Sequence, residues 1–231
     1  MKNYKIFGAK LKAFSSTKGQ PDISSFLDAV NIDKQQVYLA EQVHGDVVAE
    51  INDHMILIED PRYPGVKMIK GVDALITNKP GLALITRTAD CVPVMIFDPK
   101  NKVIANVHAG WKGTAKKIVA KTIKILKDKY GTAASDCLFA IGPSAGKCCY
   151  EVGEQVHKGI GEEFIENKAG KKYADLWSAN IAQILSAGGK RENIETSGIC
   201  TICNNDYFSY RREGKDTGRI FNMISILVDG R

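Results

Sequence analysis

The sequence lacks a long hydrophobic run, which argues against a membrane-spanning helix. No stretch of its 231 residues approaches the roughly 20 consecutive apolar residues that such a helix needs. The first residues, MKNYKIFGAK, contain lysines but no continuous apolar segment, so we expect no secretory signal. We therefore expect a cytoplasmic protein, and the six cysteines fit free thiols in a reducing compartment.

The sequence also lacks a low-complexity linker, a repeat at a fixed period and any break in composition. Its 44% of hydrophobic residues are enough to bury a substantial core. We therefore predict a single domain that covers residues 1–231.

A concentrated basic patch is missing too, although the net charge is +6. The densest lysine cluster, KKIVAKTIKILKDK at residues 116–129, has apolar residues at helical spacing, with lysines mainly on the opposite face. This pattern favours a solvated helix surface over a nucleic-acid patch. We expect neither nucleic acid nor membrane as a partner, and the mild positive charge would attract anionic small molecules.

Short β-branched runs separated by turn residues predict a strand-rich middle of the chain. The predicted strands are 72–77, 82–86, 92–97, 102–107, 137–141, 194–200 and 220–227. Amphipathic spacing predicts helices over 113–129, 153–164 and 174–187, the last with Leu176, Trp177, Ile181, Ile184 and Leu185 buried. Adjacent strands broken by long helices predict an α+β fold, a layered α/β sandwich with mixed β-sheets.

Three residues that could do chemistry lie at the ends of apolar elements. His44 lies in EQVHGD, Cys91 ends TRTADC, and His108 ends VIANVH. Side chains at such ends often converge on a shared rim, and two imidazoles with one thiolate would suit zinc with an open fourth position. Their separation matches no zinc-finger pattern. Spacing alone therefore slightly favours two hydrogen-bonded edge histidines and a small buried cysteine.

The remaining cysteines and histidines carry weaker signals. Cys200 and Cys203 form CTIC, which would need two further ligands to bind a metal. The neighbouring Cys148 and Cys149 could supply them only if the fold brings them close, so we expect structural roles for all four. His54 and His157 are expected on the surface.

Six motifs occur in order between residues 41 and 219: EQVHG, VDALIT, TADCVPV, NVHAGWKGT, AIGPSAGKCCYEVG and FSYRREGKDTGR. Through them the sequence resembles the multicopper polyphenol oxidase (laccase-domain) family. Its members are now largely regarded as purine nucleoside phosphorylases with adenosine deaminase activity, and a bacterial branch is described as a peptidoglycan-editing factor. The resemblance implies that His44, Cys91 and His108 are the catalytic residues and hold a zinc ion, which copper could replace in vitro.

The resemblance further implies a purine nucleoside and phosphate as small-molecule substrates. Adenosine, inosine and S-methyl-5'-thioadenosine would be cleaved, and adenosine would be deaminated at the same zinc-associated site. The cations expected to hold phosphate or substrate are Lys18, Lys112, Arg211, Arg212 and Arg219. Lys18 lies in FSSTKG, which is shorter than the corresponding family loop, and Lys112 stands where relatives commonly have arginine. A charged surface hairpin is the alternative for the arginine-rich segment, and Arg87 is expected to face solvent.

Three other functions remain to be weighed. A Cys–His pair could hydrolyse a peptidoglycan precursor, as in an editing amidase. A laccase would need a trinuclear copper cluster as well, and only His54 and His157 are left to build it, which argues against oxidation of polyphenols. Retention of all three site residues disfavours a binding protein without activity. The sequence leaves the oligomeric state, the physiological substrate and the role of the metal open.

Overall fold

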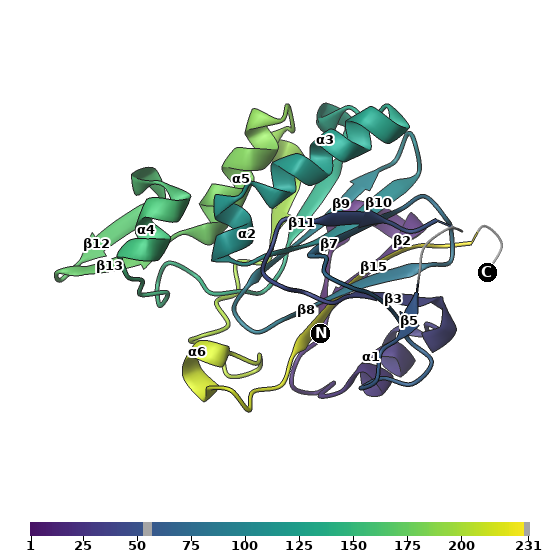
Figure 1. Ribbon diagram of the computed structural model, residues 1–231, viewed down its shortest axis with the longest axis horizontal. Helices are drawn as coiled ribbons and strands as arrows, with labels where there is room; N and C mark the ends of the chain where they lie inside the picture. Colours follow the sequence, from purple (N-terminus) through teal and green to yellow (C-terminus); the bar gives the residue numbers. More distant parts are fainter. Residues whose placement is uncertain (53–56, 229–231) are drawn as a thin grey trace.

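Two mixed β-sheets packed face to face form the centre of the computed structural model, which describes residues 1–52 and 57–228 (Figure 1). The seven-stranded sheet has the order β1 (Lys2–Asn3), β2 (Leu11–Ser15), β15 (Ile220–Ile226), β8 (Ala83–Thr88), β3 (Val37–Ala40), β6 (Lys67–Ile69), β5 (Ile58–Glu59). The six-stranded sheet has the order β14 (Ile194–Thr196), β11 (Leu138–Ile141), β9 (Val92–Asp98), β10 (Val103–Ala109), β7 (Ala74–Thr77), β4 (Val48–Glu50).

Both sheets combine parallel and antiparallel pairs. In the seven-stranded sheet β3 runs parallel to β6 and β8, while β15 runs antiparallel to β2 and β8. In the six-stranded sheet β10 runs antiparallel to β7 and β9, while β4 and β14 add parallel edges. The predicted α+β sandwich with mixed sheets is therefore confirmed.

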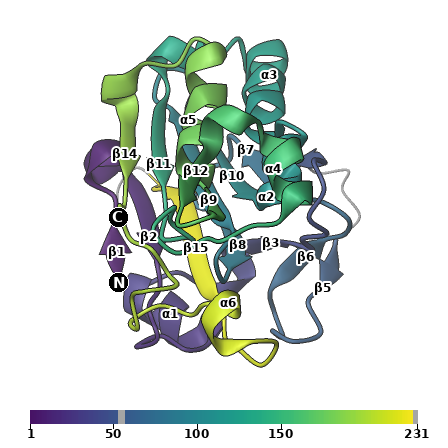
Figure 2. The same ribbon diagram turned by 90° about the vertical axis from the view of Figure 1, so that its left-hand side faces the viewer.

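Three of the helices cover the outer faces of the two sheets (Figures 1 and 2). The bounds of the helices are α1 (Ile23–Val30), α2 (Trp111–Ala115), α3 (Ile118–Tyr130), α4 (Glu154–Ile160), α5 (Leu176–Ser186) and α6 (Tyr210–Glu213). Helices α3 and α5 pack on the six-stranded sheet and α1 on the seven-stranded sheet. A hairpin of β12 (Ile165–Lys168) and β13 (Lys171–Ala174) lies beside α4.

Alternation along the strands divides the core into layers. In β10, Val103, Ala105 and Val107 pack against the helices, whereas Ile104 belongs to the apolar layer between the sheets. Successive side chains of a strand point to opposite faces, so Asn106 and His108 share the inner face with Ile104. The end of β10 therefore presents polar groups to the space between the sheets.

Asn106 joins the two sheets through a fully buried set of hydrogen bonds. Its side-chain amide donates to the carbonyl of Leu84 at 2.8 Å and to that of Asn222 at 2.7 Å. Its oxygen accepts from the Thr86 hydroxyl at 3.1 Å. Buried polar groups are retained when their hydrogen-bonding capacity is filled, and here the partners fix how β10 crosses β8 and β15.

The prediction of one continuous helix over 113–129 is wrong. This stretch consists of α2, which already begins at Trp111, and α3, separated by Lys117 with φ at 61°. A left-handed residue cannot continue the helical hydrogen-bond ladder, so the chain changes direction there. As a result α2 stays beside the loop containing Gly45 while α3 lies across the six-stranded sheet.

Several other bounds differ from the predictions, among them those of two helices and one strand. The helix predicted over 153–164 stops at Ile160, because Gly161 at φ 101° ends it before a 3₁₀ turn. The one predicted over 174–187 begins at Leu176, where the Asp175 carboxylate accepts from Ser178 N. Leu185 is 41% exposed rather than buried. The strand predicted over 194–200 ends at Thr196.

His157 is also not a surface residue. It is buried, with its ring nitrogens facing Lys172 and Glu162. His54 lies outside the described residues. Across the described ranges, no helix combines the length and apolar character needed to cross a membrane.

We expect Asn106→Ala to lower the free energy of unfolding by about 1–3 kcal/mol, because the substitution leaves two buried carbonyls without their hydrogen-bond donor. Urea unfolding followed by circular dichroism measures the change. Asn167→Ala on the exposed surface of β12 serves as the control and should shift stability by less than about 0.5 kcal/mol. An unchanged urea midpoint for Asn106→Ala would show that the bridge does not stabilise the sandwich.

Candidate active site

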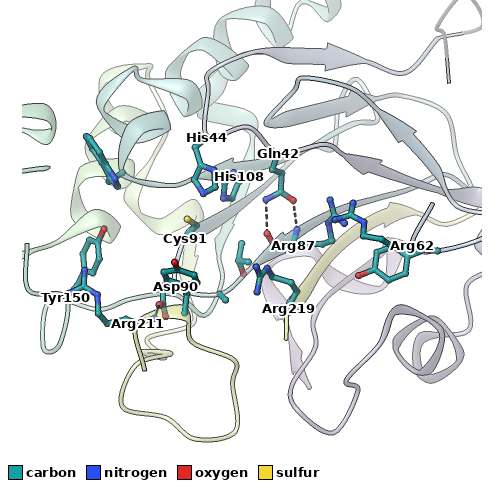
Figure 3. A pocket seen from close by; sticks show the side chains of 15 residues that line it. Gln42, His44, Arg62, Arg87, Asp90, Cys91, His108, Tyr150, Arg211 and Arg219 are labelled. Carbon is teal, nitrogen blue, oxygen red and sulfur yellow. Dashed lines mark hydrogen bonds between the residues drawn. The ribbon is translucent and has the colours of Figure 1, made fainter. Parts of the chain in front are cut away.

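His44, Cys91 and His108 come together where the two sheets meet (Figure 3). One ligand atom from each lies within 4.8 Å of the others. The two imidazoles meet edge to face, with ring centroids 4.9 Å apart. Residues separated by 47 and 17 positions in the sequence thus form one compact cluster.

Each member of the cluster is placed by a strand end. Cys91 directly precedes β9, and the register pairs Pro93 of that strand with His108 of β10. His44 lies in the loop of residues 41–47, which joins β3 to β4, and its backbone is left-handed with φ at 58°. A non-glycine residue holds such a conformation only when its surroundings impose it.

Asp73 imposes that conformation. Its buried carboxylate accepts from His44 N at 3.0 Å, from Gly45 N at 2.7 Å and from Val43 N at 3.3 Å. It also lies 2.8 Å from Nδ1 of His108. This pairing fixes the His108 ring so that Nε2 faces the cluster, as carboxylates do behind metal-ligating histidines.

Charge within the cluster alters the pKa values of its members. Burial alone would raise the pKa of Cys91, but His108 and His44 outweigh it and lower that pKa to about 6. Burial would likewise lower the pKa of His108, yet the Cys91 thiolate and Asp73 raise it to about 9. At neutral pH the metal-free cluster therefore holds a thiolate beside an imidazolium.

Gly110 leaves room for the cluster. A Cβ at this position would lie 2.9 Å from Cys91 Sγ, closer than real Cβ atoms come, and 3.3 Å from His44 Cδ2, a tight contact. Together with the two imidazoles, the thiolate and the carboxylate behind His108, this open approach fits a zinc-type ion. The donor set therefore suits a three-ligand site whose fourth position faces the cavity.

Among the described residues, the histidine outside the cluster does not provide a trinuclear copper centre. Outside the cluster, the described part of the chain contains only His157, which is buried between Lys172 and Glu162. A trinuclear copper cluster needs several free imidazoles, so the ligand set of the described residues does not support laccase chemistry.

A cavity of about 770 Å³ opens in front of the cluster. Its aromatic lining residues are Tyr63, Trp111, Tyr150 and Tyr210, and its cationic ones are Arg62, Arg87, Arg211 and Arg219. Cavities of this size hold drug-sized ligands. Aromatic faces beside several cations suit a molecule with a planar ring and an anionic group.

The structure separates the five predicted substrate-binding cations. Arg211 and Arg219 line the cavity, whereas Lys18, Lys112 and Arg212 are not among the residues that line it. Lys18 pairs with Glu213, and the Lys112 ammonium lies 5.7 Å from the Trp111 ring centroid.

Arg212 has an architectural set of partners instead. Its guanidinium donates to the main-chain carbonyls of Thr201, Ile202, Asn204 and Tyr207 and pairs with Glu213. These bonds fold the turn that leads into α6. Arg211 and Arg212, adjacent in sequence, therefore point to different environments.

Several lining residues carry no signal strong enough for prediction from sequence. Arg87, expected in solvent, has a side chain only 9% exposed, which contacts Asp60 and the carbonyl of Ala40. Gln42 exchanges two hydrogen bonds of 2.7 Å with the main chain of Arg87 (Figure 3). Asp90 accepts from Thr201 Oγ1 and Arg211 N. The one signal in the sequence is a charged residue inside an apolar run, Arg87 in LALITRT and Asp73 in VDALIT, which suggests a buried polar role.

We expect iodoacetamide to alkylate Cys91 of the metal-free protein with a pH midpoint near 6, because the thiolate forms above its pKa of about 6. Peptide mapping by mass spectrometry across pH 4–10 follows this cysteine separately from the others. Asp73→Asn should move the midpoint upward, since loss of the carboxylate weakens the His108 imidazolium that favours the thiolate.

Asp46→Asn is the matched control, because Asp46 lies in the same loop but pairs with Lys121 at the surface. Its midpoint should equal that of the wild type. A wild-type midpoint at the ordinary thiol value of about 8.5 would contradict the proposed thiolate–imidazolium pair.

The chain is similar in sequence to several known proteins. The family model described as multi-copper polyphenol oxidoreductase laccase matches residues 19–227. A purine nucleoside phosphorylase of Bacteroides thetaiotaomicron is 41% identical over 169 residues, which cover 69% of this chain and 63% of that protein. Adenosine deaminase RL5, from an unknown prokaryotic organism, is 30% identical over 93% of both chains.

The fold is similar to that of a solved structure. The crystal structure of YlmD from Geobacillus stearothermophilus superposes with a TM-score of 0.86 and 26% identity, covering 97% of this chain and 94% of that one. The family model and this whole-chain likeness lead to one conclusion. The chain belongs to the multi-copper polyphenol oxidoreductase laccase family.

Proposed function

We propose that this protein is a cytoplasmic purine nucleoside phosphorylase for adenosine, inosine and S-methyl-5'-thioadenosine that also deaminates adenosine. The observation that carries the proposal is the cavity, in which His44, Cys91 and His108 face aromatic rings and arginines. Relatives named purine nucleoside phosphorylase and adenosine deaminase support it.

The charge of the cavity wall supports binding of phosphate. Arg62 and Arg87 both contact the Asp60 carboxylate, which offsets part of their charge. Within the described ranges, Arg211 and Arg219 have no carboxylate partner, and their guanidinium groups donate to main-chain carbonyls. We therefore assign phosphate to these two side chains.

In phosphorolysis, a phosphate oxygen forms a bond to C1' of the ribose while the bond from C1' to N9 of the purine breaks. The electron pair of that bond leaves with the base, and the sugar carries positive charge in the transition state. A phosphate dianion held by Arg211 and Arg219 both attacks and stabilises that charge. The proton of the attacking hydrogen phosphate passes to the departing purine, so the products from adenosine are adenine and ribose 1-phosphate.

The aromatic side chains suit the purine. Burial raises the pKa of Tyr150 to about 12, a direction that the Cys91 thiolate reinforces, so its hydroxyl keeps its proton at neutral pH. The guanidinium of Arg211 lies over the same ring at 5.2 Å. Tyr150 therefore presents a flat apolar surface and a proton-bearing hydroxyl next to the proposed phosphate site.

Deamination uses the same cluster differently. Water adds to C6 of adenosine and ammonia leaves, which gives inosine. In the metal-free site, His108, whose Nδ1 is held by Asp73, is placed to give a proton from Nε2 to the leaving amine and to take one back from the attacking water. When Nε2 binds a metal, His108 acts as a ligand and not as an acid or base. A zinc ion held by His44, Cys91 and His108 would supply Lewis-acid polarisation of a bound oxygen.

We expect the wild type to convert adenosine and phosphate into adenine and ribose 1-phosphate, with inosine as a second product. Cys91→Ala should reduce both products by at least about 100-fold, because it removes the charged centre of the site. Chromatography of reactions with and without phosphate measures each product. Cys137→Ala, which changes a thiol in the hydrophobic core, should keep turnover per folded molecule.

The pattern of products decides between the two activities. If inosine forms but no phosphate-dependent adenine does, deamination is the one activity of the two that the protein has. Products that do not exceed the Cys91→Ala background for adenosine, inosine and S-methyl-5'-thioadenosine would overturn the proposal.

We expect Arg211→Gln and Arg219→Gln each to lower kcat/KM for phosphate by about 10–100-fold. This is the effect of losing a charge-assisted hydrogen bond of about 1.5–3 kcal/mol. The rate of phosphate-independent deamination should change much less, which separates phosphate binding from damage to the site. Arg191→Gln, at an exposed position, is the control. Equal losses in both reactions would contradict the assignment of phosphate to these arginines.

A further inference from the structure

A second cluster of metal-binding side chains lies outside the cavity lining. Cys148 and Cys149 follow β11 in the turn GPSAGKCCY, and Cys200 and Cys203 lie in CTIC between β14 and α6. One sulfur atom from each lies within 4.8 Å of all the others. The fold therefore brings two cysteine pairs about fifty residues apart into one group of four. The sequence predicted structural roles for all four and left open whether they meet.

Main-chain and side-chain contacts hold the two turns together. Ser144 N donates to the carbonyl of Ile199 at 3.2 Å, and Thr201 N donates to the carbonyl of Ser144 at 3.0 Å. The Trp177 indole donates to the Ser144 hydroxyl at 2.6 Å from the side of α5. The cluster thus rests on a bridge between the turns and not on the chance position of long side chains.

The spacing of the sulfur atoms suits a metal and not a disulfide. Sγ of Cys148 lies 3.9 Å from Sγ of Cys203. A tetrahedral Zn²⁺ site with Zn–S bonds of about 2.3 Å separates its sulfur atoms by about 3.8 Å. A disulfide would need about 2.05 Å, and all four cysteines are free thiols.

Hydrogen-bond donors already point at the buried sulfur. Gly146 N donates to Cys200 Sγ at 3.3 Å, and a Cβ on Gly146 would lie 3.1 Å from Cys200 Cβ and 3.3 Å from Cys148 Sγ. Burial raises the pKa of Cys200, but main-chain N–H groups of Cys203 and Gly146 outweigh it and lower the pKa overall. Such N–H groups favour a thiolate, the form that binds metals.

Cys148 lies among the other sulfur atoms of the cluster. Burial raises the pKa of Cys148 to about 11, and the nearby sulfur of Cys200 raises it further. Thiols packed this closely resist ionisation without a counter-ion, and a bound divalent cation removes that penalty.

We propose that Cys148, Cys149, Cys200 and Cys203 form a second, structural zinc site, separate from the His44–Cys91–His108 cluster. Four thiolates close the tetrahedron and leave no position for a substrate, which is the composition of structural zinc centres. The site would fasten the turn that leads into Tyr150 to the segment that carries Arg211. The proposal rests on the sulfur cluster itself and does not depend on the reaction in the cavity.

The test uses Cys91→Ala to weaken the first cluster, and elemental analysis of zinc, copper and iron after dialysis. We expect about one zinc per chain in Cys91→Ala. Adding Cys148→Ser and Cys203→Ser should abolish it, and these two positions are exposed, so the replacements leave packing intact. Adding Cys137→Ser instead should retain the zinc, which controls for the number of thiols.

Cobalt substitution identifies the ligands independently of activity. Co²⁺ in Cys91→Ala should give the strong thiolate-to-metal charge-transfer absorption of a four-sulfur tetrahedral site, lost in the variant that also carries Cys148→Ser and Cys203→Ser. Removing zinc from Cys91→Ala with a chelator should lower its Tm, whereas the same treatment should leave the Tm of the cysteine-pair variant unchanged.

Three results would overturn the proposal. The first is that Cys91→Ala holds no more zinc than the cysteine-pair variant, when both retain the wild-type circular dichroism spectrum. The second is iron with inorganic sulfide in place of zinc. The third is a disulfide between these cysteines in protein purified under reducing conditions, with no zinc uptake after reduction, which would assign the cluster to redox chemistry.

Discussion

The buried carboxylate of Asp73 is the group on which the site depends. Burying a carboxylate costs free energy unless its oxygens accept hydrogen bonds, and here four donors supply them. Because three of them are consecutive main-chain N–H groups, the loop after β3 must adopt the conformation that places His44 at a positive φ. The same oxygens hold His108, so one side chain at the start of β7 determines the positions of both imidazoles.

The site also follows from how polarity changes along the inner face of β10. Ile104 lies in the apolar layer between the sheets, Asn106 hydrogen-bonds across to the second sheet, and His108 reaches the cavity. Each step of two residues returns to the same face of the strand, and of these three only His108 lines the cavity. The hydrogen bonds of Asn106 thus lie between the apolar core and the active-site cluster. They also hold the two sheets in a fixed position relative to each other.

The six thiols occupy three kinds of surroundings. Cys137 is part of the hydrophobic core, Cys91 shares an open cluster with two histidines, and the other four form an all-sulfur group. Open clusters with mixed ligands suit catalysis, whereas closed sulfur clusters suit structure. In the proposed arrangement, the closed cluster joins the two segments that carry the cavity residues Tyr150 and Arg211. The structural site would therefore hold these two residues in place.

The sequence by itself determined where most of the local elements lie and, for the helices, most of the side chains that face the core. Short β-branched runs between turn residues predicted β7 to β10 within two residues, and motifs at strand ends, together with the family resemblance, singled out His44, Cys91 and His108. The extent of the domain over residues 1–231 stays a prediction. Periodicity carries this information because the direction of a side chain within a strand or helix depends only on its neighbours in sequence.

Tertiary structure alone decided which distant residues meet. An acid before a strand, as in VDALIT, does not show that Asp73 binds His108 and the His44 loop, and two cysteine pairs in separate turns do not show that they form one cluster. Lys117 breaks a helix that spacing predicts to be continuous, and the adjacent Arg211 and Arg212 diverge toward the cavity and toward main-chain carbonyls. These outcomes depend on the packing of two sheets and on the need of every buried polar group for a partner, which no local pattern encodes.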